Sequence, residues 1–155
     1  MEFETMWQIY LSGEIHTDWR EVIENGAKER GLSVAFSAPV TDHAASDDCG
    51  VKILGAEQNK FWHDRKGAGV NALRTRTLIE KADIVVVRFG EKYKQWNAAF
   101  DAGYAAALGK SLVILHPEEH AHALKEVDEA AQAVAETPEQ VVEILDYVIN
   151  GRLSA

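Results

Sequence analysis

The sequence predicts an α/β fold: a doubly wound parallel sheet of five strands with helices on both faces, in three layers α/β/α. Two short segments, residues 83–89 and 110–116, each contain four consecutive apolar residues, at 84–87 and 112–115, which is typical of parallel strands that are buried on both faces. Segments with the apolar spacing of helices alternate with the predicted strands. The length of 155 residues fits one domain that spans residues 1–155.

The first half of the chain predicts two strands and two helices. Residues 7–12 are a short β-prone run, and a helix that Thr17 or Asp18 can cap follows and ends at Gly31. The second strand covers residues 32–37. Residues 38–70 lack a clear period and predict a functional loop with short helices, before a helix over residues 71–82.

The second half predicts three more strands. Residues 83–89, 110–116 and 132–135 are the strands, residues 96–108 form a helix, and a short helix begins at Pro117. Thr137, Pro138 and Gln140 are a helix start, and that helix ends near residues 150–151. Short right-handed crossovers between these elements favour a flavodoxin-like strand order, 2-1-3-4-5.

Charge and composition exclude several classes of partner and location. The formal net charge of −9 argues against binding to a nucleic acid polymer or to an anionic membrane surface. A single cysteine, Cys49, excludes an internal disulfide. The first residues lack the pattern of a signal peptide, and no apolar run approaches the ~20 residues of a membrane-spanning helix, so we expect a cytoplasmic protein.

Three familiar motifs are set aside, and neither a cofactor nor a metal is predicted. Residues 67–72 fit GxGxxA but do not follow the first strand, and residues 109–111 resemble the tail of a phosphate loop but end a helix. His116, His120 and His122 have no HExxH spacing, and a solvated helix start explains them better than a metal site does.

In a sheet of this kind, ligands bind at the carboxyl ends of the strands, which directs attention to residues 13–18, 39–70 and 90–97. Asp101 lies nearby in a helix of otherwise small and apolar residues. If Asn97 caps that helix, the carboxylate falls near the end of the first turn, close to the sheet edge. Gly103 and the alanines would let the helix approach the sheet or a ligand closely. Spacing alone leaves a functional carboxylate and one that bonds local backbone amides equally favoured.

Two further pairs are candidates for chemistry. Glu14 and His16 follow the first strand and could supply a general acid or base. The alternative is that Glu14 interacts with a helix dipole and His16 is a surface residue. Trp62 and Asp64 in the long loop could stack on a base and contact its edge, although an aromatic residue there is more often a lid that packs on the core.

The motif FDAGYAAALGK, residues 100–110, resembles the signature of nucleoside 2-deoxyribosyltransferases. The stretches IYLSG (residues 9–13) and KADIVV (residues 81–86) are similar to the opening and to a later strand of that family, and residues 13–20, GEIHTDWR, look like its YtoQ-type branch. The resemblance covers roughly residues 7–116.

This resemblance implies cleavage of an N-glycosidic bond in a nucleoside or nucleotide through a carboxylate nucleophile. The position of the nucleophile matches Asp101, the tyrosine of the first strand matches Tyr10, and an orienting polar residue is matched by Asn71. Asp101 would act with Tyr10, Glu14 and His16 as its catalytic partners. The remaining candidates would line the substrate-binding site. These are Ser12, Gly13, Trp62, Asp64, Asn71, Gln95 and Asn97.

Two departures from the family pattern keep a second hypothesis open. Asp101 stands where the family has a glutamate, and Gln95 stands where the transferases carry an acid. A carboxylate shorter by one methylene can be misplaced by about 1 Å, which can cost roughly a hundredfold in rate. The alternative is therefore a non-catalytic nucleotide- or nucleobase-binding module. The family also assembles as oligomers, so we expect a homodimer or a higher homo-oligomer, with Tyr93, Trp96 and the final helix as candidate contacts.

Overall fold

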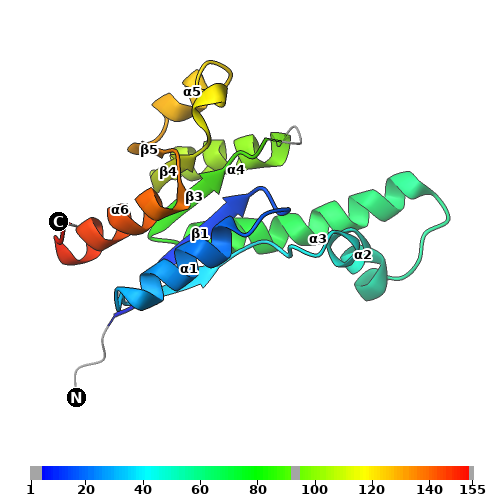
Figure 1. Ribbon diagram of the computed structural model, residues 1–155. Coiled ribbons are helices and arrows are strands. Elements are labelled where there is room, and N and C mark those ends of the chain that lie inside the picture. Colours follow the sequence, from blue (N-terminus) through cyan, green and yellow to red (C-terminus); the bar gives the residue numbers. More distant parts are fainter. Residues whose placement is uncertain (1–4, 92–94, 154–155) are drawn as a thin grey trace.

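The computed structural model describes residues 5–91 and 95–153. Five parallel strands form one sheet in the order β2-β1-β3-β4-β5, with helices on both sides (Figure 1). The strands are β1 Trp7–Gly13, β2 Val34–Ser37, β3 Ile84–Arg88, β4 Ser111–Leu115 and β5 Ala133–Ala135. The predicted fold class and strand order are confirmed.

The helices form two layers that bury two separate cores. They are α1 Trp19–Glu29, α2 His43–Leu54, α3 Lys60–Lys81, α4 Trp96–Ala107, the 3₁₀ helix η1 Glu118–His120, α5 Lys125–Glu129 and α6 Pro138–Asn150. Helices α1 and α6 cover one face of the sheet, and their core contains Ile9 and Leu11 of β1. Helices α3 and α4 cover the other face, and their core contains Tyr10. Because side chains alternate along a strand, Ser12 lies on the same side as Tyr10, toward α4.

The segment from residue 38 to residue 70 is more helical than predicted. It holds α2 and the first half of α3, which begins at Lys60 rather than at Asn71. The side chain of Asn59 caps α3 by accepting a hydrogen bond of 2.8 Å from the Phe61 amide. Helices α2 and α3 pack side by side and project past the ends of the strands (Figure 1).

Two glycines allow α2 and α3 to approach closely. A Cβ atom on Gly50 would lie 2.2 Å from the Lys66 carbonyl carbon, and one on Gly67 would lie 2.7 Å from the Asp47 carbonyl oxygen. Glycines inside a helix weaken its sequence signal, since they are poor helix formers in isolation. Tertiary packing therefore explains a helix that local propensity did not predict.

The last helix follows its sequence signal closely. Thr137 accepts a hydrogen bond of 3.2 Å from the Gln140 amide, and the Gln140 side chain accepts one of 3.3 Å from the Thr137 amide. This reciprocal pair is the predicted capping box. No helix in the described part of the chain is both long and apolar enough to cross a membrane.

Candidate functional site

The carboxyl ends of β1 and β3 meet helix α4 at a contact between Ser12 and Asp101. The Ser12 hydroxyl, which is fully buried, donates a hydrogen bond of 2.6 Å to Asp101 Oδ2. Within residues 5–91 and 95–153 this is the one hydrogen bond of the Asp101 side chain, so Oδ1 is available to a ligand. Burial raises the pKa of Asp101, and the hydrogen bond from Ser12 partly opposes that rise.

Contrary to the expectation from the sequence, Asn97 does not cap α4. The helix begins at Trp96, with Gln95 in the cap position and no side-chain cap bond. Asp101 consequently lies in the second turn, where the helix dipole has little effect. Asn97 is exposed on the first turn of α4.

Tyr10 lies beside Asp101 in the core between the sheet and α3/α4. Its hydroxyl is completely buried and makes no hydrogen bond with a described residue. Burial raises the pKa of Tyr10 to about 12; the charge of Asp101 adds to the rise, while the nearby Thr75 side chain and Arg20 oppose it. Tyr10 therefore keeps its proton at neutral pH.

The turn after β1 depends on a glycine. Gly13 has φ of 109°, and a Cβ atom there would lie 2.1 Å from the Arg88 carbonyl oxygen. The next amide, that of Glu14, donates a hydrogen bond of 3.0 Å to the same oxygen. The chain thus turns across the carboxyl end of β3, which places Glu14 next to Arg88.

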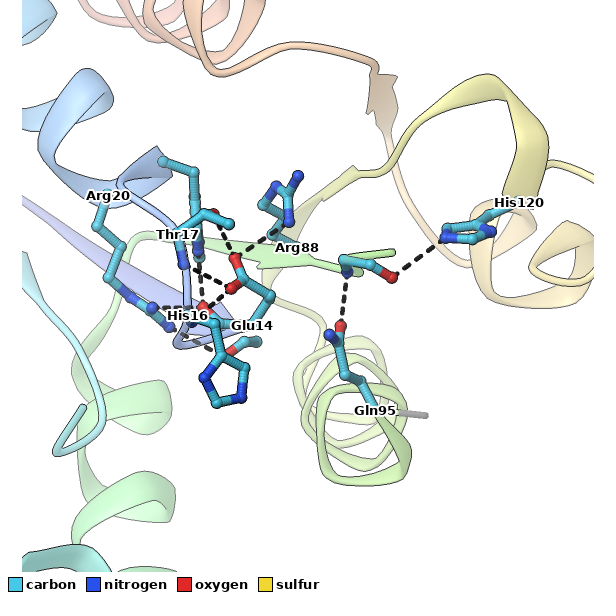
Figure 2. A network of polar contacts seen from close by, with 10 residues as sticks. Glu14, His16, Thr17, Arg20, Arg88, Gln95 and His120 are labelled. Carbon is cyan, nitrogen blue, oxygen red and sulfur yellow. Dashed lines mark hydrogen bonds and ion pairs between the residues drawn. The ribbon is translucent and has the colours of Figure 1, made fainter. Parts of the chain in front are cut away.

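Glu14 is held as a buried anion by four donors (Figure 2). Its Oε1 accepts hydrogen bonds from the amides of His16 and, at 2.7 Å, Thr17; its Oε2 accepts from the Thr17 hydroxyl at 2.6 Å and from the Arg88 guanidinium at 3.1 Å. Burial alone would raise the pKa of Glu14, but the bonds from Thr17 and His16 and the charge of Arg88 outweigh it and lower the pKa. Glu14 is therefore built as a fixed carboxylate, whereas the exposed His16 imidazole points away from it (Figure 2).

Arg20 and Trp19, at the start of α1, bind the backbone of the same turn. The Arg20 guanidinium donates to the carbonyls of Leu11 at 3.0 Å, Glu14 at 2.6 Å and Gly13 at 3.2 Å, and the Trp19 indole donates to the Glu14 carbonyl at 2.7 Å. Burial lowers the pKa of Arg20 to about 10. The stretch from residue 13 to residue 20 is thus a rigid turn whose polar side chains bind its own backbone.

Gly90 joins this turn to α4 and η1. The Gly90 amide donates to Gln95 Oε1 at 2.7 Å, and its carbonyl accepts from His120 Nε2 at 3.1 Å (Figure 2). A Cβ atom on Gly90 would lie 2.5 Å from Glu14 Cγ. Gln95, predicted to bind substrate, is therefore anchored at the site's edge through one of its two amide atoms.

The other predicted binding residues lie on α3. The Asn71 amide donates to the Ser46 carbonyl and hydroxyl, at 3.0 and 3.1 Å, and so joins α3 to α2. Trp62 is 52% exposed. Asp64 lines a hollow of about 560 Å³ on α3. The structure thus brings Ser12 of β1 into contact with Asp101 and places Tyr10 in the core under α4. Glu14 lies in the turn after β1, where it contacts Arg88.

Arg88 and Thr75 were not predicted from the sequence. Arg88 ends an otherwise apolar strand, and its partner Glu14 is 74 positions away in the sequence. A local sequence pattern therefore gives no sign that the two residues pair. Among the described residues no group of three or more His, Cys, Asp or Glu side chains is arranged to hold a metal ion. His116 is buried and bonds the Pro117 carbonyl at 2.7 Å and Asp128 at 2.8 Å.

Comparison with known proteins supports the resemblance. The family model described as "Nucleoside 2-deoxyribosyltransferase YtoQ" matches residues 10–149. The chain belongs to this family. Its similarity extends to "Uncharacterized protein YtoQ" of Bacillus subtilis (strain 168), with 44% identity over 142 residues, 92% of this chain and 96% of the relative.

Solved structures support the fold of this YtoQ family member. A conserved protein from Enterococcus faecalis V583 superposes with a TM-score of 0.62 at 15% identity, over 93% of this chain and 99% of that one. A 2-deoxyribosyltransferase from Bacillus psychrosaccharolyticus gives a TM-score of 0.52 at 15% identity, over 87% and 90% of the two chains. A CheY-like receiver domain from Methanospirillum hungatei JF-1 gives 0.51 at 11% identity, over 95% and 96%. At these identities the likeness concerns the fold.

Proposed function

We propose that this protein cleaves the N-glycosidic bond of a nucleoside or nucleotide, as a transferase or a hydrolase, with Asp101 as the nucleophile. The observation that carries the proposal is the 2.6 Å hydrogen bond from Ser12 to Asp101 Oδ2, beside the buried Tyr10 hydroxyl. That bond fixes the carboxylate and leaves Oδ1 for attack. The chain belongs to a family described as nucleoside 2-deoxyribosyltransferase YtoQ, and its fold is similar to that of a 2-deoxyribosyltransferase. Both similarities support the same chemistry.

The reaction would proceed through two displacements. Asp101 Oδ1 attacks the anomeric carbon, the bond from that carbon to the base nitrogen breaks, and the base leaves with the electron pair and takes up a proton. A nitrogen of an acceptor base, or water, then attacks the same carbon and releases the carboxylate. The Ser12 hydroxyl, which donates to Oδ2, holds Asp101 in place between the two steps.

Glu14 and His16 take different roles in this proposal. The lowered pKa of Glu14 and its four hydrogen bonds make it a poor proton donor, and Arg88 neutralises its charge. We therefore assign Glu14 to holding the turn after β1 in place. The exposed His16 imidazole is then the group that exchanges protons with the leaving base.

The substrate is expected to lie over the ends of β1 and β3. Ser12, Gly13, Gln95 and Asn97 border that area, and the Gln95 amide nitrogen, which donates no hydrogen bond to a described residue, is a donor for a base or sugar oxygen. Trp62 and Asp64 remain candidates for the far end of the ligand. The Asn71 amide is already bonded to Ser46, so we assign it to helix packing.

The test is chromatographic detection of free base from a panel of ribo- and 2′-deoxyribonucleosides and their 5′-monophosphates, with and without an acceptor base. Wild-type protein should release base from at least one compound, and Asp101→Asn should not. The matched control for the lost charge is Asp18→Asn, at the exposed start of α1. Variants of the buried Tyr10 and Glu14 are not suitable controls, because they would also affect folding. Equal turnover by Asp101→Asn and wild type would remove the nucleophile from the proposal.

A second candidate is a nucleotide- or nucleobase-binding module without turnover. It is favoured by the shorter carboxylate of Asp101, and by Gln95, whose carbonyl oxygen is tied to the Gly90 amide. Calorimetry distinguishes the two candidates. A compound that binds tightly and stays intact through a long incubation supports the binding module, while release of base supports the enzyme.

A further inference from the structure

Gly90, two residues after β3, lies where side chains from four parts of the chain converge. Its amide donates to Gln95 Oε1 at 2.7 Å, and its carbonyl accepts from His120 Nε2 at 3.1 Å. A Cβ atom on Gly90 would lie 2.5 Å from Glu14 Cγ, 2.9 Å from Arg88 Nη1 and 3.1 Å from Gln95 Nε2. A residue with a side chain would therefore displace the groups that line this edge of the candidate site.

Gly103, the glycine of α4, has the opposite setting. It is exposed, and a Cβ atom there would meet nothing within 4 Å. The expectation that Gly103 lets α4 approach the sheet closely was therefore wrong. Close approach at the site concerns Gly90 instead.

The two peptide groups that flank Gly90 are held by different side chains. The amide that bonds Gln95 belongs to the peptide group before the Gly90 Cα atom, and the carbonyl that bonds His120 belongs to the group after it. Gln95 and His120 approach from different directions (Figure 2). Glycine has wide freedom in φ and ψ, so both anchors are needed to hold its backbone in one conformation.

The bond to Gly90 also decides which end of the Gln95 amide is left for a ligand. Oε1 accepts from the Gly90 amide, and a reversed side chain would place two N–H donors against each other. Nε2 donates no hydrogen bond to a described residue, so Gln95 offers a donor and binds an acceptor atom. Tyr93, which the sequence suggested as a contact between copies, lies outside the described residues.

The donor on His120 comes from a well-anchored segment. The His120 amide donates to the Pro117 carbonyl at 3.1 Å, and the His120 carbonyl accepts from the Leu124 amide at 2.9 Å. The Pro117 carbonyl also bonds His116 Nδ1 at 2.7 Å, and His116 Nε2 bonds Asp128 at 2.8 Å. The 3₁₀ helix η1 is thus attached both to the end of β4 and to α5.

We infer that His120 is a positioning residue of the candidate site: it holds the backbone of Gly90 and thereby keeps Gln95 in the one orientation that offers Nε2 to an acceptor atom of the substrate. That the acceptor belongs to a substrate rests on the proposed function, whereas the orientation of Gln95 does not. A carbonyl oxygen only accepts, so His120 Nε2 carries a proton in the neutral and in the charged ring alike. His120 acts here as a hydrogen-bond donor and not as a group that transfers protons.

Hydrogen exchange of the Gly90 amide, followed by NMR, tests the contact without any substrate. His120→Leu removes the donor, so exchange at Gly90 should become at least about tenfold faster, while the Val86 amide inside β3 keeps its protection. His120→Gln carries an amide nitrogen at a reach similar to that of Nε2 and should restore exchange to within about twofold of wild type. His122→Leu, at an exposed histidine of the same segment, is the matched control and should leave exchange at Gly90 unchanged.

A double-mutant cycle with Gln95→Met tests whether His120 acts through Gln95. Methionine has a similar length but neither donates nor accepts as an amide does. On the nucleosides and 5′-monophosphates from which wild type releases base, His120→Leu and Gln95→Met should each raise KM at least about fivefold with kcat little changed. The double variant should match Gln95→Met alone, because His120 then has nothing left to position. His120→Gln should keep the wild-type KM.

Three results would overturn the inference: unchanged Gly90 exchange in His120→Leu, no rescue by His120→Gln, or KM effects that multiply in the double variant. A fall in kcat that His120→Gln does not restore would show proton transfer instead of positioning. If Gly90 exchange follows the prediction and no compound is cleaved, the held orientation of Gln95 stands and the proposed function fails. If compounds are cleaved and His120→Leu keeps the wild-type KM, the proposed function stands and this inference fails.

Discussion

Ser12 and Asp101 join the end of β1 to the second turn of α4 through a hydrogen bond of 2.6 Å. Two opposing influences meet in this contact. Burial destabilises the charged form of Asp101 and raises its pKa, and the Ser12 hydroxyl stabilises that form. A carboxylate held in this way destabilises the folded state when it ionises, and this effect on folding can be measured separately from the proposed chemistry.

Asp101→Asn should raise the thermal unfolding midpoint at pH 7. The folded-state pKa of Asp101 is raised, so ionisation at neutral pH favours the unfolded chain, and the amide removes that penalty. The gain should vanish as the pH falls below the ordinary carboxyl value of about 4, where both states are protonated. Calorimetric scans from pH 4 to 8 check this, with Asp18→Asn as the charge-matched control. A lower midpoint than wild type at pH 7 would contradict it.

Ser12→Ala should move the acidic limb of the pH–rate profile to higher pH. The hydroxyl lowers the pKa of Asp101, so its loss leaves burial unopposed and the carboxylate forms only at higher pH. The rate at low pH should fall more than the rate on the alkaline side. Ser111→Ala, at the exposed start of β4, should leave the limb in place. An unshifted limb in Ser12→Ala would mean that another group titrates.

Glu14→Gln should destabilise the protein by about 3 kcal/mol at pH 7, because a buried carboxylate with charged and neutral donors is replaced by an amide that cannot accept from all of them. The folded-state pKa of Glu14 is lowered, so its contribution is present above the ordinary glutamate value and is lost as the pH falls through the lowered one. Urea unfolding at several pH values measures this. Glu21→Gln, exposed on α1, is the control; equal effects of the two variants would sink the prediction.

Gly13→Ala should cost at least about 3 kcal/mol, because it combines a left-handed backbone with a Cβ atom 2.1 Å from the Arg88 carbonyl oxygen. Gly31 separates the two causes. It has φ of 67° and nothing within 4 Å of its Cβ position. Gly31→Ala should therefore cost only about 1–2 kcal/mol, the strain of the backbone alone. Equal unfolding free energies for the two variants would refute the steric part.

The sheet could be predicted from the sequence because each buried strand carries its own local signal. Residues 84–87 of β3 are apolar without interruption, and the capping box at Thr137 is read from adjacent residues. Helices α2 and α3 were predicted incompletely for the opposite reason. Gly50 and Gly67 resemble helix breakers, and their purpose becomes visible only when the two helices are packed together.

The candidate site, like the fold, could be predicted from the sequence only in part. Asp101 and Tyr10 were identified by resemblance to a family, and in the structure Asp101 contacts β1 at Ser12 while Tyr10 lies in the core between the sheet and α3/α4. The lowered pKa of Glu14 was not predicted, because it depends on hydrogen bonds from Thr17 and His16 that need the folded turn, and on the charge of Arg88 at the end of another strand. Thr75 gave no signal, because a threonine on a long helix has no distinctive spacing. Contacts between distant parts of the chain decide protonation, and sequence patterns report mainly local structure.

Intact-protein and peptide mass spectrometry after incubation with 2′-fluoro-substituted arabinosyl nucleosides tests the nucleophile most directly. Fluorine next to the anomeric carbon slows release of a glycosyl-enzyme, so the ester should accumulate. The account predicts a mass increase of one sugar on the peptide that contains Asp101, and none in Asp101→Asn. Base release by wild type with the sugar on a different residue, or with the same adduct in Asp101→Asn, would contradict it.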